Sequence, residues 1–203
     1  MNQLCTDRYN GYMVLKNLIA GAAVSAMLFS SCTENKTTDD AVVWERKGDS
    51  LVTKTFDTLR NTLTKAIGEK GLAGAVEFCN TQALELTNSF TGEGITVKRS
   101  SDKLRNPANA PDSIEQRILS SFLQLKRKDG EIKPVLERDA AGNHHYFKPI
   151  ILQAMCLNCH GDKTTQIKPD VWNVIQQKYP ADAAFDYKEG DLRGIWHVMF
   201  SDK

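Results

Sequence analysis

The sequence predicts an α+β domain, because helical periodicity comes first along the chain and strand-like segments come later. Segments 42–67 and 72–90 place apolar residues three and four positions apart, as the buried face of a helix does. Short segments near residues 95, 135, 148 and 197 have strand patterns. Helices followed by scattered antiparallel strands are typical of the α+β class. We therefore expect one antiparallel sheet covered by helices.

Glycines and capping residues set the ends of the predicted helices. Gly68 and Gly71 separate the first helix from the second. Asp112 followed by Glu115 three residues later has the pattern of a capping box, and it predicts the start of a third helix. A proline at the first position favours a short fourth helix over residues 169–179.

The strand segments can also be placed in order. Residues 95–99 alternate apolar and polar side chains, and the turn-rich segment 105–112, RNPANAPD, follows them. Segments 135–138 and 145–152 are joined by AAGN, which predicts a β-hairpin. Residues 194–201, GIWHVMFS, predict a final strand. These strands are the expected members of the sheet.

The N-terminal region predicts export. Residues 18–29 form an uncharged apolar run of twelve residues, with Lys16 just before it. A membrane-spanning helix needs about 20 apolar residues, so the run fits the core of a secretory signal instead. The following sequence LFSSC, residues 28–32, resembles a bacterial lipobox, in which the cysteine is lipidated and becomes the mature N-terminus. The alternative is an ordinary cleaved signal followed by a cysteine without a role, Cys32.

The chain therefore divides into a signal peptide over 1–31, a polar tether over 32–41 and a folded domain over 42–203. A compact signal with a basic start begins at Met13, and we expect translation to start there rather than at Met1. The mature protein is expected to face the bacterial periplasm, attached to a membrane through its N-terminal lipid.

The charge balance argues against a nucleic-acid-binding protein. The chain has 26 lysines and arginines against 25 aspartates and glutamates, whereas nucleic-acid binders usually carry a basic excess. Removal of the signal takes away Arg8, Lys16 and Asp7, which leaves 24 basic and 24 acidic residues. Membrane attachment then depends on the acyl chains rather than on surface charge.

The sequence CLNCH, residues 156–160, carries the clearest chemistry. C-x-x-C-H is the attachment pattern of a c-type haem, because two thiols reach the two vinyl groups of one porphyrin and the next histidine reaches the iron. Cys156 and Cys159 are the predicted thioether residues, and His160 is the predicted proximal ligand. Half a zinc site is the first alternative, but no second ligand pair follows. A thioredoxin-like pair is the second, but it would leave the histidine unexplained.

The other axial ligand is less constrained by the sequence. Met155 adjoins the attachment motif and cannot easily reach the opposite face of a haem. His144 and His145 fall at the predicted hairpin, where a solvated histidine is expected, and His197 is expected to be hydrogen-bonded within the last strand. Cys79 lies on the apolar stripe of the second helix. It is either a buried free thiol or a ligand of the iron.

Five segments in this order, CNTQALEL, RNPANAPD, YFKPI, CLNCHG and GDLRG, resemble a bacterial family of single-haem sensor domains. The structural reference of that family is a cyanobacterial c-type haem protein with a PAS-like fold and His/Cys iron ligation. The resemblance covers about residues 42–203. It implies a PAS-like domain, thioether bonds at Cys156 and Cys159, a proximal ligand at His160 and a distal ligand at Cys79. Many relatives have proline where this chain has Leu84, so the second helix is expected to be straighter.

The resemblance and the ligand chemistry together predict a redox or diatomic-ligand sensor, not an enzyme. A thiolate favours ferric iron, and reduction would weaken its bond. Cys79 could then leave and open a site for CO or NO, as a switch requires. No transmitter domain is recognisable, so a separate redox or signalling partner would read the state out. The alternatives are a membrane-tethered electron carrier and, less favoured, a haem peroxidase.

Haem propionates need cationic partners, and a guanidinium pairs well with a carboxylate. Four basic residues flank the matched segments, although for any single one of them a solvated surface charge is the more common role. The candidates are Arg99, Arg105, Lys148 and Arg193.

Overall fold

The computed structural model describes residues 36–201, so the predicted signal peptide and the predicted lipidation site, Cys32, lie outside the described residues. Helix α1, Lys36–Asn88, contains both of the predicted N-terminal helices. It begins within the predicted tether rather than at residue 42, because the polar sequence there has no glycine or proline to stop it. The predicted break lies at Gly71, where φ is 71° and ψ is 178°.

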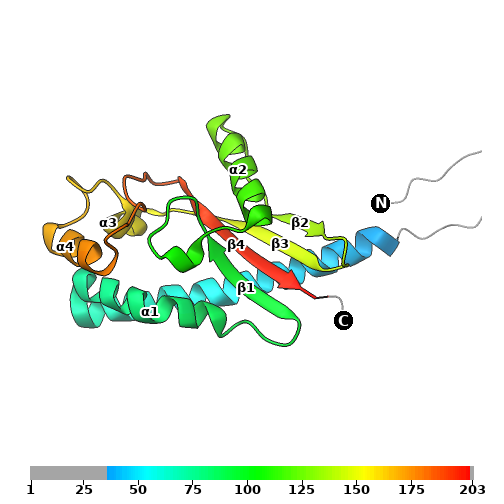
Figure 1. The fold of residues 1–203 in the computed structure, drawn as a ribbon, viewed down its shortest axis with the longest axis horizontal. Helices are drawn as coiled ribbons and strands as arrows, with labels where there is room; N and C mark the ends of the chain where they lie inside the picture. The colour runs from blue at the N-terminus through cyan, green and yellow to red at the C-terminus, as the bar shows by residue number, and fades with distance from the viewer. Residues whose placement is uncertain (1–35, 202–203) are drawn as a thin grey trace, which may run out of the picture. The chain divides into compact units, whose positions relative to one another are not determined.

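Four strands form one antiparallel sheet, as predicted, in the order β1-β4-β3-β2. They are β1 (Ile95–Ser100), β2 (Val135–Arg138), β3 (His144–Ile151) and β4 (Leu192–Phe200). Figure 1 shows β4 inside the sheet and α1 running along its length. The predicted α+β class is confirmed. The last strand in the sequence, β4, lies between β1 and β3.

Helix α2, Ser113–Arg127, begins with the predicted capping box. The Asp112 side chain accepts a hydrogen bond from the Glu115 backbone N–H at 2.8 Å, and the Glu115 side chain accepts one from the Asp112 N–H at 2.9 Å. These two bonds satisfy N–H groups that a helix start leaves without partners. They also fix the position of the buried Glu115 carboxylate.

The remaining helical elements are short. They are η1 (Pro107–Asn109), η2 (Ala154–Cys156), α3 (Leu157–His160) and α4 (Pro169–Lys178). Figure 1 shows α3 and α4 at one end of the domain. There α4 packs its apolar face against the part of α1 that follows the break. Within residues 36–201, no helix has both the length and the apolar character needed to cross a membrane.

The core lies on both faces of β4. Trp196 and Val198 pack on the side of α1, whereas Ile195 packs with the buried face of α2. Successive side chains of a strand point to opposite faces, so one strand contributes to both layers. Two chemically different environments can therefore form on either side of the same strand.

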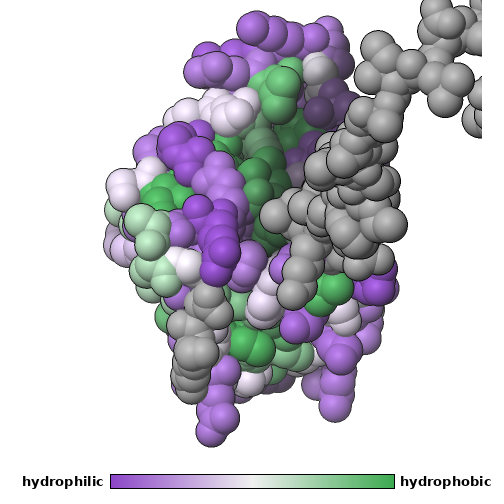
Figure 2. Space-filling view, turned by 90° about the vertical axis from the view of Figure 1, so that its right-hand side faces the viewer, coloured by the Kyte–Doolittle hydropathy of each residue, from purple (hydrophilic) through white to green (hydrophobic). Residues whose placement is uncertain are grey.

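An open groove of about 760 Å³ lies where β1 begins and β4 ends. Apolar side chains line it beside basic ones from α1, and Figure 2 shows hydrophobic residues between polar ones on this side of the molecule. The apolar members are Val43, Trp44, Leu51, Ile95 and Phe200. None of the candidate ligands lies among the residues that line this groove.

Candidate functional site

A second cavity, of about 300 Å³, lies between the later part of α1, the connection from β1 to α2, and the CLNCH segment. It brings together side chains that are up to 140 positions apart in the sequence, from Phe56 to Trp196. All four predicted iron-linked and thioether residues line it. They are Cys79, Cys156, Cys159 and His160.

Much of the wall is apolar. Four leucines of α1 and Ile67 form one side, and Ile150, Leu152 and Trp196 contribute from the sheet and its continuation. A cavity with apolar walls and a few fixed polar groups is the usual form of a cofactor site. The chemistry of the polar groups decides which cofactor it fits.

The attachment segment presents its three reactive groups through η2 and α3. One helical turn separates Cys156 from Cys159, so both thiols lie on one side of the segment. His160 Nδ1 lies 2.7 Å from the Ala184 carbonyl oxygen, so Nδ1 is the nitrogen that donates. The lone pair is then on Nε2, the arrangement that metal-ligating histidines usually have.

The protonation of His160 also suits a ligand. Burial lowers the pKa of the imidazole well below its usual value, and the charges of Arg105 and Arg193 lower it further. The imidazole is therefore neutral at physiological pH, and neutral imidazole is the form that binds metals.

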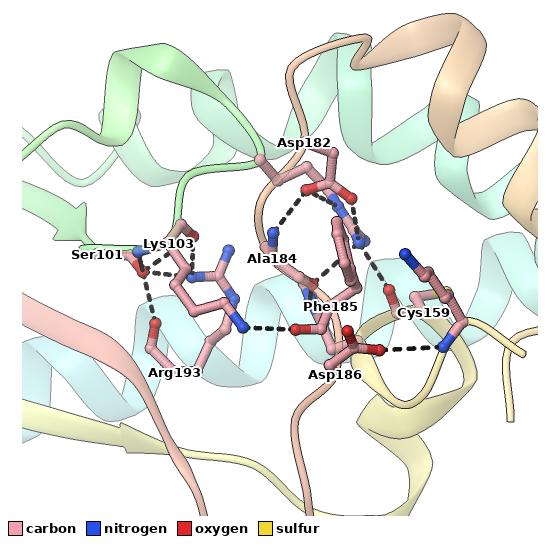
Figure 3. A network of polar contacts seen from close by, with 11 residues as sticks. Ser101, Lys103, Cys159, Asp182, Ala184, Phe185, Asp186 and Arg193 are labelled. Atoms are coloured by element: carbon pink, nitrogen blue, oxygen red, sulfur yellow. Dashed lines mark hydrogen bonds and ion pairs between the residues drawn. The ribbon is translucent and has the colours of Figure 1, made fainter.

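Arg105 fixes the attachment segment to the loop that precedes β4. Its guanidinium donates to both carboxylate oxygens of Asp182, at 3.2 and 2.9 Å, and to the Cys159 carbonyl at 2.7 Å. It also donates to the Ala184 carbonyl at 3.2 Å, the same oxygen that holds His160. Figure 3 shows this cluster, with Asp182 and Ala184 on one segment and Cys159 opposite. One side chain thus positions both the second thiol and the imidazole.

Positive charge exceeds negative charge around the cavity. Arg99, Arg105 and Arg193 line it, and no aspartate or glutamate is among the described residues that do so. The buried Arg99 Nε has no hydrogen-bond partner within the described part of the chain, although its Nη2 donates to the Ala83 carbonyl at 3.1 Å. A buried guanidinium without a full set of partners calls for an anionic group.

These residues fit a haem. The thiols suit its vinyl groups, the neutral imidazole suits its iron, and the arginines suit its two propionates. Three of the four predicted propionate partners therefore lie at the cavity.

Lys148 is the exception, because the structure does not bring it to the cavity. Its ammonium lies 2.5 Å from Asp49 on α1, which occupies it in an ion pair.

Two expectations for the histidines had different outcomes. His197 is hydrogen-bonded within the fold, as predicted. The expectation that His145 is solvated is wrong, because only 6% of it is exposed and both ring nitrogens have partners. Its neighbour His144 points to the other face of the strand, where it stacks on Trp44 with 4.5 Å between the ring centroids.

Sequence reasoning missed several residues of the site, and two of them show why. Trp196 lines the cavity and lies near the Arg99 guanidinium, 5.7 Å from carbon to ring centroid. The alternation of β4 places it on the same face as Val198, so the pattern could have revealed it. Asp182 lies in an irregular loop without periodicity, and no sequence signal indicates its pairing with Arg105.

Comparisons with known proteins support the same cofactor. The sequence matches the family described as Tll0287-like over residues 33–201. The chain is also similar to the crystal structure of the cyanobacterial haem-protein Tll0287, with 28% sequence identity and a TM-score of 0.51. That match covers 75% of this chain and 93% of the other. Among curated proteins, none matches the sequence. The similarity to a haem protein supports haem as the cofactor, and the predicted resemblance to the single-haem domain family is confirmed. The chain belongs to the Tll0287-like family.

Proposed function

We propose that this protein carries one covalently attached haem and works as a lipid-anchored, periplasm-facing sensor of redox state or of a diatomic ligand. The observation that supports it best is the single cavity that gathers two thiols in the attachment spacing, a neutral imidazole and a third thiol. In this proposal Cys156 and Cys159 form the thioether bonds. His160 and Cys79 would hold the iron.

The environment of Cys79 supports a ligand that can be released. Burial raises the pKa of the thiol, whereas the charges of Arg99 and Arg105 lower it. Haem, when bound, supplies an iron whose positive charge falls by one on reduction. The two arginines stabilise the Cys79 thiolate while the iron is ferric, and burial favours the protonated thiol once that attraction weakens. The protein would thus change its ligand set with its redox state.

Cys79→Ala tests this assignment directly. The expected result is a changed ferric absorption and electron paramagnetic resonance spectrum, because one axial ligand is lost. Thr81→Ala is the matched control, since Thr81 is an exposed residue two positions along the same helix. An unchanged low-spin ferric spectrum in the Cys79 variant would exclude Cys79 as a ligand.

The same samples separate a sensor from an electron carrier. A sensor loses the Cys79 bond on reduction and then binds CO, whereas a carrier keeps both ligands in both states. Spectra of the ferrous protein with and without CO distinguish these outcomes. A peroxide turnover assay on the wild-type protein tests the peroxidase alternative, which needs an acid-base group near the iron.

Attachment to a membrane is a separate part of the proposal. Labelling of cells with a radioactive fatty acid should mark the wild-type protein and leave Cys32→Ser unmarked. Equal labelling of both proteins would contradict lipidation at Cys32.

A further inference from the structure

A chain of hydrogen-bonded polar side chains crosses the face of the sheet opposite the cavity. It consists of Asp139, His145, His197, Glu115 and Lys98, and we call it the buried relay. Asp139 follows β2, the histidines come from β3 and β4, Glu115 comes from α2, and Lys98 comes from β1. The members are far apart in the sequence, so only the fold assembles them.

Each link of the buried relay has hydrogen-bond geometry. His145 Nε2 lies 3.1 Å from Asp139 Oδ2, and His197 Nδ1 lies 2.9 Å from Glu115 Oε1. Between the rings, His145 Nδ1 lies 2.9 Å from His197 Nε2. Lys98 Nζ donates to Glu115 Oε2 at 2.7 Å and closes the chain.

The relay is shielded from water at its centre. His145, His197 and Glu115 are 6%, 8% and 0% exposed, and the Phe147 ring stacks on His197 at 4.4 Å between centroids. Buried polar groups must then satisfy one another. The centroids of the two histidine rings are 5.2 Å apart. That is about the distance expected when the 2.9 Å contact between the nitrogens lies on the line that joins the two ring centres. The two inner nitrogens therefore face each other directly.

Counting the hydrogens on the histidine nitrogens gives the charge of the buried relay. An ionised carboxylate only accepts hydrogen bonds, so the outer nitrogens, His145 Nε2 and His197 Nδ1, each carry a hydrogen. Two neutral imidazoles have two hydrogens in total, and both are used at the ends. The inner contact would then bring two lone pairs to 2.9 Å. One further hydrogen converts this repulsion into an N–H···N bond.

We propose that His145 and His197 form a proton-binding site that holds one excess proton between Asp139 and Glu115. The pair is an imidazolium hydrogen-bonded to an imidazole. With two carboxylates, one ammonium and one shared proton, the buried relay is neutral overall. That balance makes its burial tolerable, because buried charges need partners of opposite sign.

The other charged groups around the pair do not disturb this balance. Asp112 lies close enough that one of its oxygens is within 4.8 Å of ligand atoms of Glu115 and His197, but it is exposed to solvent. Glu137 lies opposite His145 on β2 and is held by Arg117 at 2.9 Å. Both carboxylate oxygens of Glu115 already have partners, Oε1 in His197 and Oε2 in Lys98.

The buried relay is hydrogen-bonded to a segment that borders the cavity. Lys98 Nζ donates to the Ala110 carbonyl at 3.0 Å as well as to Glu115. Ala110 belongs to the connection from β1 to α2, in which Arg105, Asn106 and Asn109 line the cavity.

Histidine-selective ¹⁵N labelling of the holoprotein tests the site in the reduced state under CO, in which the haem iron is six-coordinate and diamagnetic. At pH 8, where an isolated histidine is almost entirely neutral, three of the four ring nitrogens of the pair should be protonated. His145→Gln and His197→Gln assign the signals. Two independently titrating neutral rings would overturn the proposal.

The pH dependence of unfolding gives a second readout. Above about pH 7.5 both histidines are neutral in the unfolded chain, whereas the folded pair keeps one excess proton. Unfolding then releases one proton, so the unfolding constant should rise about tenfold per pH unit. This rise should be absent from the His145→Gln/His197→Gln variant. His144→Gln, an adjacent histidine outside the relay, should keep the wild-type slope. Equal slopes in the wild-type and double-variant proteins would refute the shared proton. If the double variant does not fold, the wild-type ¹⁵N spectrum decides alone.

Discussion

Gly71→Ala tests how the fold delivers Cys79 to the cavity. Gly71 has a φ of 71° and a ψ of 178°, a region of backbone conformation that is essentially restricted to glycine. Alanine there should destabilise the folded state by about 2–3 kcal/mol, because a Cβ makes this conformation strained. For a domain of this size, that loss corresponds to a melting temperature lower by roughly 4–12 °C.

Thermal denaturation followed by circular dichroism measures this loss, and Gly68→Ala is the control. Gly68 lies in α1 before the break, and nothing lies within 4 Å of an added Cβ. Alanine should stabilise that position by about 0.5–1 kcal/mol, since it favours the helix. Gly71→Ala should also alter the ferric absorption spectrum, because Cys79 follows the break by two turns. Equal melting temperatures for Gly71→Ala and the wild-type protein would refute the role of the break.

Three further substitutions test other parts of the structure. Burial raises the pKa of Glu115, but hydrogen bonds from His197 and Lys98 lower it to about 2. The ionised carboxylate therefore stabilises the fold above about pH 4.5, and this stabilisation is lost as the pH falls toward 2. Between pH 5 and 2, Glu115→Gln should lose about 3 kcal/mol less unfolding free energy than the wild-type protein, measured with urea. The same loss in both proteins would contradict this. Arg105→Met leaves the buried Asp182 carboxylate unpaired and should cost about 3–5 kcal/mol in urea unfolding, whereas a loss below 1 kcal/mol would show that the pair is unimportant. Gly48→Ala places a Cβ 2.3 Å from the Tyr146 ring and should cost about 1–3 kcal/mol by overpacking, measured against Gly68→Ala; a stabilised variant would show that α1 does not pack there as described.

Local signals in the sequence predicted most of the elements. Three of these elements depend on residues within a few positions of one another. They are the capping box at Asp112, the hairpin of β2 and β3, and the glycine break in α1. Such features form wherever the local pattern permits, so their boundaries were close to those observed. The CLNCH motif is local in the same sense, because its two thiols need only one helical turn.

Contacts between residues that are far apart in the sequence could not be predicted from local patterns. The sequence could not show that Asp182 pairs with Arg105, because an irregular loop separates α4 from β4. It could not show that Lys148 is held by Asp49 on α1, about a hundred positions away. The burial of His145 has the same cause, since α2 covers the sheet face to which its side chain points.

The placement of Cys79 combines both kinds of information. Periodicity put it on the apolar stripe of a helix, which on spacing alone favoured a buried free thiol over a ligand. The structure adds that this stripe borders the cavity that also contains His160, with Arg99 and Arg105 nearby. The proposed ligand role therefore rests on tertiary structure and on the family resemblance more than on spacing.

The central claim is covalent attachment of one haem in the cavity, and the intact mass of the purified mature protein tests it most directly. We predict the mass of the polypeptide plus one haem after denaturation in acidified organic solvent, with an absorption spectrum that stays with the polypeptide. The Cys156→Ser/Cys159→Ser variant should have lost this added mass. A wild-type polypeptide without the haem mass, or a haem that extracts freely into the solvent, would contradict the account.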